Sequence, residues 1–224
     1  MAMARGVRCC SGGWKNRCVS KKLLCRCIGR GAFCTEYAAT GNEWCLARVA
    51  RGSSICPMRV LAIDPSLRGT GFAILEKAGA KVRAVIYGTI KNRPDLLPSG
   101  CLVAIHERIG DLIREHAPEC AAVEGVIFVQ SHRIAITLGA ARGAAILAAA
   151  SRGLPIYEYA PRRVKQSVVG KGAAQKNQVA FMVRALLGLT ETPSADAADA
   201  LAIGLTHLQT AGSAARGLAP LERI

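Results

Sequence analysis

The run Arg59-Val60-Leu61-Ala62-Ile63-Asp64, closely followed by proline, serine and glycine, decides the fold of this chain. A short apolar run that ends in an acid and meets turn residues is typical of a buried β-strand. The strand ends at Asp64, where the carboxylate loses part of its hydration on burial. We therefore expect the Asp64 side chain to be paired with another group.

Further strands and helices are predicted outward from this run. Two more strands, at 72–75 and 82–90, are separated by a turn at Ala78-Gly79, which indicates an antiparallel meander. Beyond them, strands are predicted at 120–124 and 155–159, with helices at 99–116, 131–151, from 161 onward, at 176–187 and from Ser194 to about 209. Three antiparallel strands followed by alternating strands and helices predict an α/β fold with a mixed sheet flanked by helices.

Composition and charge restrict the class of protein. The chain has 224 residues, 51% of them hydrophobic but only 4% aromatic, which excludes a disordered polar protein and a collagen-like one. Thirty Lys and Arg against 15 Asp and Glu give a net charge of +15. Such a surplus attracts polyanions, so nucleic acid is the first expected partner and an acidic membrane the second.

No membrane insertion or export is expected. The most apolar stretch, 134–150, is interrupted by Arg142 and is too short for the roughly 20 residues of a spanning helix. We predict that it forms a buried helix. The first 30 residues contain no uninterrupted apolar centre of the signal-peptide kind, so the cytoplasm is the expected location.

The first 57 residues differ from the rest. They hold eight of the ten cysteines and both tryptophans, and they carry ten Lys and Arg against two Glu. The spacings of the cysteines do not match zinc modules, and no export signal accompanies a disulfide framework. We interpret 1–57 as a basic, disordered leader or as sequence upstream of a natural start at Met58, 58–210 as the folded domain, and 211–224 as a flexible tail.

Three further acids resemble Asp64 in their setting. Glu124 also ends an apolar strand, and Asp196 and Asp199 lie three residues apart in a helix rich in alanine. Any one of them could be a helix cap or a surface ion pair. Because no Lys or Arg lies within four residues of Asp196 or Asp199, a metal is the better counterion for the set. Oxygen ligands suit Mg²⁺ or Mn²⁺, and a pair of such ions predicts phosphodiester hydrolysis.

Basic residues gather around the loop Gly170-Lys171-Gly172, between two predicted helices. The residues that we expect to contact DNA are Arg162, Lys165, Lys171 and Lys176. A solvated helix face is the simpler alternative, but glycines and nearby acids favour contact with phosphates.

These motifs together resemble the RuvC-type Holliday-junction resolvases, nucleases of the ribonuclease-H-like fold. The resemblance runs from Met58 to about Thr210. Its motifs are Ala62-Ile63-Asp64-Pro65, Thr70-Gly71, Val123-Glu124, Leu138-Gly139-Ala140-Ala141-Arg142-Gly143, Val164-Lys165-Gln166-Ser167-Val168-Val169-Gly170 and Ala195-Asp196-Ala197-Ala198-Asp199-Ala200-Leu201-Ala202.

The resemblance implies an enzyme of DNA recombination and repair that nicks two opposed strands of a four-way junction. It implies that Asp64, Glu124, Asp196 and Asp199 bind the catalytic metal, Mg²⁺ or Mn²⁺, with two ions per site. Lys165 and Lys176 would act near the phosphate. It also implies a homodimer, for which the helix 131–151 is the expected face, and the RuvA–RuvB branch-migration motor as partner.

Two departures from the family pattern concern the site. Ser66 stands where the family often has glycine, and Ile127 stands where it often has an aromatic residue, so Phe128 is the candidate for base stacking. Another ribonuclease-H-like nuclease, of the RNA-processing or transposition type, is the main alternative. A non-cleaving junction-binding scaffold of the same fold would be expected to lack one or more of the four acids, and all four are present. A sugar-kinase or actin-like ATPase would need a second glycine-rich phosphate loop, which the sequence lacks.

Overall fold

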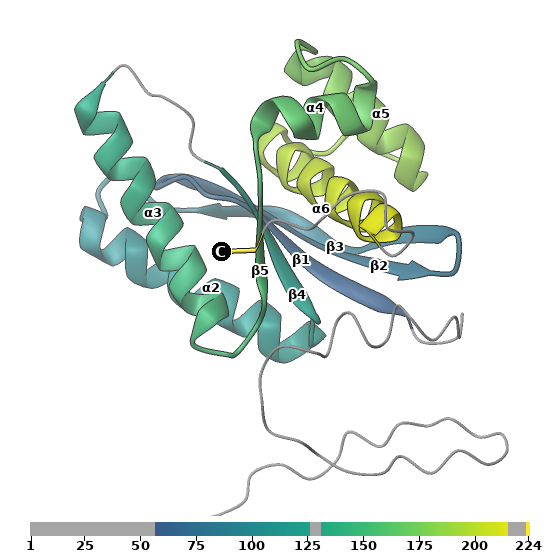
Figure 1. Cartoon of the computed structure of the whole chain (residues 1–224). Coiled ribbons are helices and arrows are strands. Elements are labelled where there is room, and N and C mark those ends of the chain that lie inside the picture. The colour runs from purple at the N-terminus through teal and green to yellow at the C-terminus, as the bar shows by residue number, and fades with distance from the viewer. Residues whose placement is uncertain (1–56, 126–130, 215–222) are drawn as a thin grey trace, which may run out of the picture. The chain divides into compact units, whose positions relative to one another are not determined.

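One five-stranded sheet with helices on both faces organises the part of the chain that the structure, a computed structural model, describes (Figure 1). The described residues are 57–125, 131–214, 223 and 224, so residues 1–56 of the expected leader and Phe128 lie outside them. The strands are β1 (Met58–Asp64), β2 (Gly69–Ala78), β3 (Lys81–Lys91), β4 (Cys120–Glu124) and β5 (Ile156–Tyr159). The helices are α2 (Pro98–His116), α3 (His132–Ala150), α4 (Pro161–Val169), α5 (Lys176–Leu187) and α6 (Ala195–Ala214).

The strand order is β3-β2-β1-β4-β5. The first three strands form the predicted antiparallel meander, and β4 and β5 add to the other edge of β1 in parallel. The chain crosses from β3 to β4 through α2, because a parallel neighbour cannot be reached by a hairpin. The prediction of a mixed α/β sheet is confirmed.

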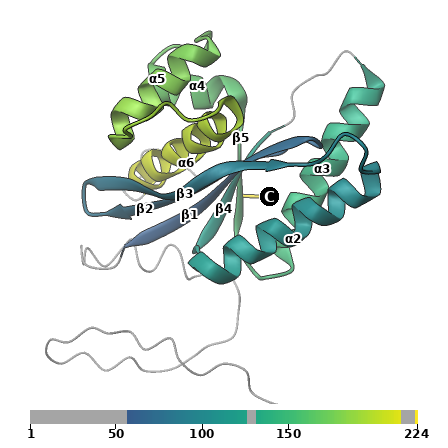
Figure 2. The same ribbon diagram turned by 180° about the vertical axis from the view of Figure 1, so that it is seen from behind.

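The two faces of the sheet carry separate cores (Figures 1 and 2). The helices α2 and α3 cover one face, where they meet Leu61 and Ile63 of β1. On the other face α6 covers Val60 and Ala62, and α4 and α5 pack on α6. Since side chains alternate along a strand, Asp64 continues the series of Val60 and Ala62 and lies on the α6 face.

Strand β2 and the C-terminal residues extend beyond their predicted limits. β2 begins at Gly69, because Gly69 pairs with Lys91 of β3 and Gly71 pairs with Asp64 of β1 instead of forming a free turn. Helix α6 continues to Ala214, and near the chain end Arg223 forms a bridge with Tyr157 while the Ile224 amide donates to the Ile156 carbonyl. These residues differ from the flexible tail that we expected at 211–224.

The expectation that 134–150 forms a buried helix is wrong. Only four alanines of α3 are buried, whereas Ile136 is 73% exposed and Leu147 is 60% exposed. The helix meets the sheet and α2 along one narrow side and leaves the other open. By length and composition alone α3 could cross a membrane, and 22% of that stretch is buried.

Candidate active site

Two carboxylates meet where β1 and β4 end. The parallel register pairs Ile63 with Val123, so the next residues, Asp64 and Glu124, are neighbours on the α6 face. The carboxyl groups of Asp64 and Glu124 lie close enough to share a hydrogen bond. Burial, and then the charges of Glu124 and Asp199, raise the pKa of Asp64 to about 8. The site is therefore crowded with negative charge.

Helix α6 brings the other two acids to the same end of the sheet. Asp64 pairs across β1 and β2 with Gly71, and a Cβ at Gly71 would lie 2.1 Å from the carbonyl oxygen of Asp196. A Cβ at Gly69 would lie 3.0 Å from Oδ2 of Asp196. The two glycines thus let the first turn of α6 rest on β2 beside Asp64. Asp199 acts electrostatically on Asp64 and Glu124, and Asp196 acts on Lys176.

The turn that follows Asp64 is held by a buried hydroxyl. Thr70 is fully buried, and its Oγ1 donates to the Ser66 carbonyl at 2.6 Å and accepts from the Ser66 amide at 3.2 Å. These bonds use only the backbone of Ser66, so the turn accommodates a serine where the family often has glycine. The sequence pattern marked Thr70-Gly71 but not this contact.

Lys176 is the cation that pairs with one of the acids. Its ammonium group lies 2.9 Å from Oδ2 of Asp199, 23 residues away in sequence. This hydrogen bond and the charge of Asp199 raise the pKa of Lys176. Burial, together with the charge of Asp199, raises the pKa of Glu124, while its hydrogen bond from Asp64 and the charges of Lys176 and Lys165 oppose the rise. The local rule that found no counterion near Asp199 missed this long-range pair.

The donors gathered here suit a hard divalent cation, because all are carboxylate oxygens. Among the residues described, no three His, Cys, Asp or Glu side chains stand close enough to hold an ion as they are arranged. The Lys176 ammonium on Asp199 supplies positive charge beside these acids. The carboxylates therefore fit a metal by their chemistry, although their present arrangement does not surround one.

The other predicted cations lie on α4 and the turn after it. Residues 161–190 contain six Lys and Arg and no Asp or Glu. Arg162 and Lys171 are exposed, and Arg162 packs along Gly172, where a Cβ would lie 2.7 Å from its Cγ. Lys165 is half-buried and acts on Glu124. The structure brings Lys165 and Lys176 to the acids and places Arg162 and Lys171 on the adjoining surface.

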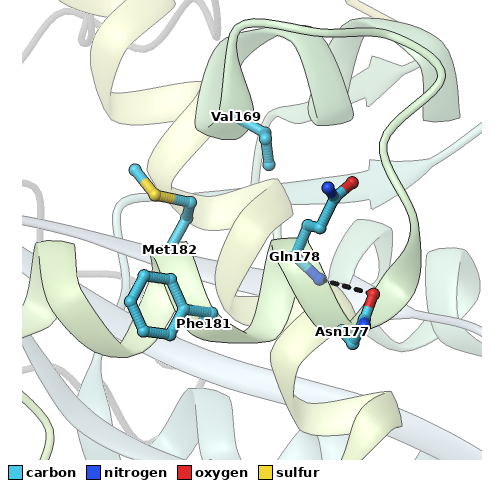
Figure 3. A pocket seen from close by; sticks show the side chains of 5 residues that line it. All are labelled: Val169, Asn177, Gln178, Phe181 and Met182. Carbon is cyan, nitrogen blue, oxygen red and sulfur yellow. Dashed lines mark hydrogen bonds between the residues drawn. The ribbon is translucent and has the colours of Figure 1, made fainter.

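An open apolar pocket of about 350 Å³ lies on this α4–α5 surface (Figure 3). Its lining residues are Val169, Asn177, Gln178, Phe181 and Met182. The Phe181 side chain is 66% exposed. None of the four acids lines it, so the acidic chemistry lies at the end of the sheet and not in this cavity.

Comparison with known proteins points to one family. The family model described as crossover junction endodeoxyribonuclease RuvC matches residues 60–207. A protein of that name from Akkermansia muciniphila is 58% identical over 154 residues, which cover 69% of this chain and 92% of that protein. A protein of the same name from Edwardsiella ictaluri is 43% identical over 157 residues, covering 70% and 90%.

A solved structure agrees with the sequence relatives. RuvC of Thermus thermophilus, in complex with a Holliday junction substrate, superposes with a TM-score of 0.67 at 37% identity. The match covers 75% of this chain and 99% of that one. The ribonuclease-H-like arrangement expected from the motifs is therefore the fold of this chain.

Proposed function

Because this chain belongs to the RuvC family of crossover junction endodeoxyribonucleases, we propose that it resolves four-way DNA junctions by nicking two opposed strands. The observation that carries the proposal is the meeting of Asp64, Glu124 and Asp199 at one end of the sheet. Beside them lies a surface whose charged residues, over 161–190, are all Lys or Arg. Acids next to a cationic surface suit hydrolysis of a polyanion's backbone.

The residues that would hold the metal are Asp64, Glu124, Asp196 and Asp199, with Mg²⁺, or Mn²⁺ in its place, and two ions per site. Bound there, the ions would supply the charge that activates a water molecule and stabilises the leaving oxygen of a phosphodiester. Burial and the neighbouring carboxylates raise the pKa of Asp64, so a cation held between the acids would favour its ionised form. The four acids then act as ligands.

Lys176 and Lys165 stabilise negative charge at the same place. Lys176 is held by Asp199 but its side chain is 72% exposed, so the ammonium can also meet a phosphate from solvent. Arg162 and Lys171 bind the DNA backbone on the adjoining surface. Contacts of this kind fix the position of the duplex without reading its sequence.

A homodimer formed through α3 accounts for the exposed side of that helix. His132, Arg133 and Ile134 are exposed in the first turn of α3; beyond that turn the exposed residues recur at helical spacing and are small or apolar, and they are Ile136, Gly139, Ala140, Gly143, Leu147 and Ala150. A Cβ at Gly139 or Gly143 would meet nothing within 4 Å, so a second backbone can approach closely there. Two copies related by a twofold axis would present two sites to two opposed strands.

The same pairing gives the apolar side of α3 a protein partner instead of a membrane. We place the enzyme in the cytoplasm with the DNA, and we propose the RuvA–RuvB motor as the partner that delivers junctions. The nuclease domain of this proposal spans residues 58–210.

The test is a nicking assay with the full chain, Mg²⁺ and a synthetic four-way junction. We expect paired nicks at symmetrical positions in opposed strands, and little cutting of a linear duplex or an RNA–DNA hybrid. Asp196→Asn should bind the junction without cutting it. Asp95→Asn is the matched control, because Asp95 forms an exposed ion pair with Arg93. Cutting by Asp196→Asn at the parent rate would contradict the proposal.

A further inference from the structure

A second ion pair lies behind the acidic site, on the opposite face of the sheet. Tyr157 and Tyr159 of β5 belong to the α6 core, so the intervening Glu158 points to the α3 face. There Nη2 of Arg142, from α3, lies 2.5 Å from Oε2 of Glu158. The two side chains are 20% and 30% exposed, so the pair is largely shielded from water.

The other oxygen of Glu158 touches the backbone next to a proposed metal ligand. A Cβ at Gly125 would lie 2.5 Å from Oε1 of Glu158, so this oxygen fills the space of a side chain at 125. The Gly125 amide donates to the Tyr159 carbonyl at 2.9 Å. Gly125 directly follows Glu124, and it is therefore fixed by β5 through both its amide and its Cα.

We propose that Arg142 and Glu158 are positioning residues for Glu124. Arg142 holds the Glu158 carboxylate, Glu158 presses on Gly125, and Gly125 sets the direction in which the Glu124 side chain leaves the end of β4. The proposal rests on the proposed function, since it gives the pair a role in placing a metal ligand.

The ion pair is poorly built for stability alone. Nε of Arg142 is buried, and within the described residues it has no hydrogen-bond partner. A buried charged group with an unsatisfied donor contributes less than a well-packed apolar pair of the same volume. The contact between Glu158 and Gly125 instead indicates that the ion pair holds the Gly125 backbone in place. Arg142 also lies on the helix that carries the exposed apolar side, so the dimer face and Glu124 are joined through one rigid element.

The pair is tested with Glu158→Gln, which keeps the shape of the side chain, and with Arg142→Lys, which keeps the charge. The matched control is Arg152→Lys, just beyond the C-terminal end of α3, because its guanidinium packs on Gly110 and donates to the Ala148 carbonyl away from the acids. The measurements on the full-length protein are Mn²⁺ affinity by calorimetry, melting temperature, junction binding without metal and single-turnover nicking.

We expect both test variants to bind Mn²⁺ about tenfold more weakly and to nick about tenfold more slowly. Losses of this size are typical when a group that orients a metal ligand is changed. Metal-free junction binding of both variants should match the parent, whereas loss of the shielded ion pair should lower the melting temperature of Glu158→Gln. Arg152→Lys should match the parent in every measurement. Parent-like Mn²⁺ affinity in Glu158→Gln overturns the inference, and so does an equal loss in the control. If Arg142→Lys does not fold, Glu158→Gln decides alone.

Gly125→Ala supplies a second test through coupling. The added methyl group displaces the Glu158 carboxylate, so this variant alone should lose about as much Mn²⁺ affinity as Glu158→Gln. Combined, the two substitutions should lose less than the sum of their separate effects, because they break one contact. Additive losses would overturn the inference. A parent protein that fails to nick junctions would refute the proposed function, whereas a parent that nicks alongside unaffected variants refutes this inference alone.

Discussion

The carbonyl oxygen of Asp196 lies directly against Gly71, at 2.1 Å from the position that a Cβ would take. Gly71 is the cross-strand partner of Asp64, so this contact sets the distance between the first turn of α6 and the end of β1. A side chain at position 71 would push the helix, and Asp196 with it, away from Asp64.

Gly71→Ala should therefore destabilise the protein and slow nicking. Overpacking against a rigid backbone costs about 1–3 kcal/mol, which a urea unfolding curve measures. Gly212→Ala is the control in α6, because its nearest neighbour would be the flexible Lys77 Nζ at 3.4 Å. Equal stability and activity in the two variants would show that the contact at Gly71 has no influence on the site.

Lys176→Ala should weaken junction binding and lower the slope of log affinity against log salt by about one unit. The nicking rate should fall further than binding does, since Lys176 also neutralises Asp199. Lys81→Ala is the control, because Lys81 is exposed at the start of β3, at the other end of the strands from Asp64. The prediction fails if both lysines change the slope and rate alike.

The stability of the fold should decrease between pH 6.5 and pH 4 because of His207. Its imidazole is fully buried, with Nε2 3.2 Å from the Cys120 thiol and Nδ1 2.9 Å from the Tyr159 hydroxyl. Burial lowers the pKa of His207 from 6.5 to about 4. The unfolded chain therefore binds the proton first as pH falls, and stability present above pH 6.5 is lost down to pH 4.

This loss amounts to about 3 kcal/mol at most, by the free energy of a pKa difference of that size. Urea unfolding at a series of pH values measures it in the parent and in His207→Gln. The variant should be less stable at pH 7 and should lose less of its stability on acidification. A parallel decline in both proteins would assign the acid sensitivity to other groups.

Leu147→Glu should convert a dimer into a monomer. Leu147 lies on the open side of α3 and is 60% exposed, so the folded protomer tolerates a charge there while a second copy does not. Sedimentation velocity reads the mass, and the assay should show single nicks in place of paired ones. Leu186→Glu, on α5 and 47% exposed, is the control and should leave the mass unchanged. A parent that sediments as a monomer contradicts the dimer.

The acids and the strands that carry them could be predicted from the sequence because their signals are local. Apolar runs that end in Asp64 and Glu124 describe buried strands, and the spacing of Asp196 and Asp199 describes one face of a helix. The alternation of helices and strands after the meander predicted a mixed sheet, whereas the strand order is known only from the structure. Local pattern also gave α5 its limits, Lys176–Leu187.

The contacts that complete the site depend on residues far apart in the chain, so no local pattern reveals them. The pairing of Lys176 with Asp199 and that of Arg142 with Glu158 exist only after the sheet has formed. The approach of Asp196 to Gly71 is of the same kind. The expectation that 134–150 is buried within its own protomer failed for a related reason, because an apolar helix has the same composition whether another chain or its own core covers it.

Anomalous diffraction from crystals of the full chain soaked in Mn²⁺ tests the central claim most directly. The account predicts anomalous density between the carboxylates of Asp64, Glu124 and Asp199, at the ends of β1 and β4, with Asp196 within reach. Density held by other residues in a protein that still nicks junctions, with these carboxylates left without metal, would contradict it.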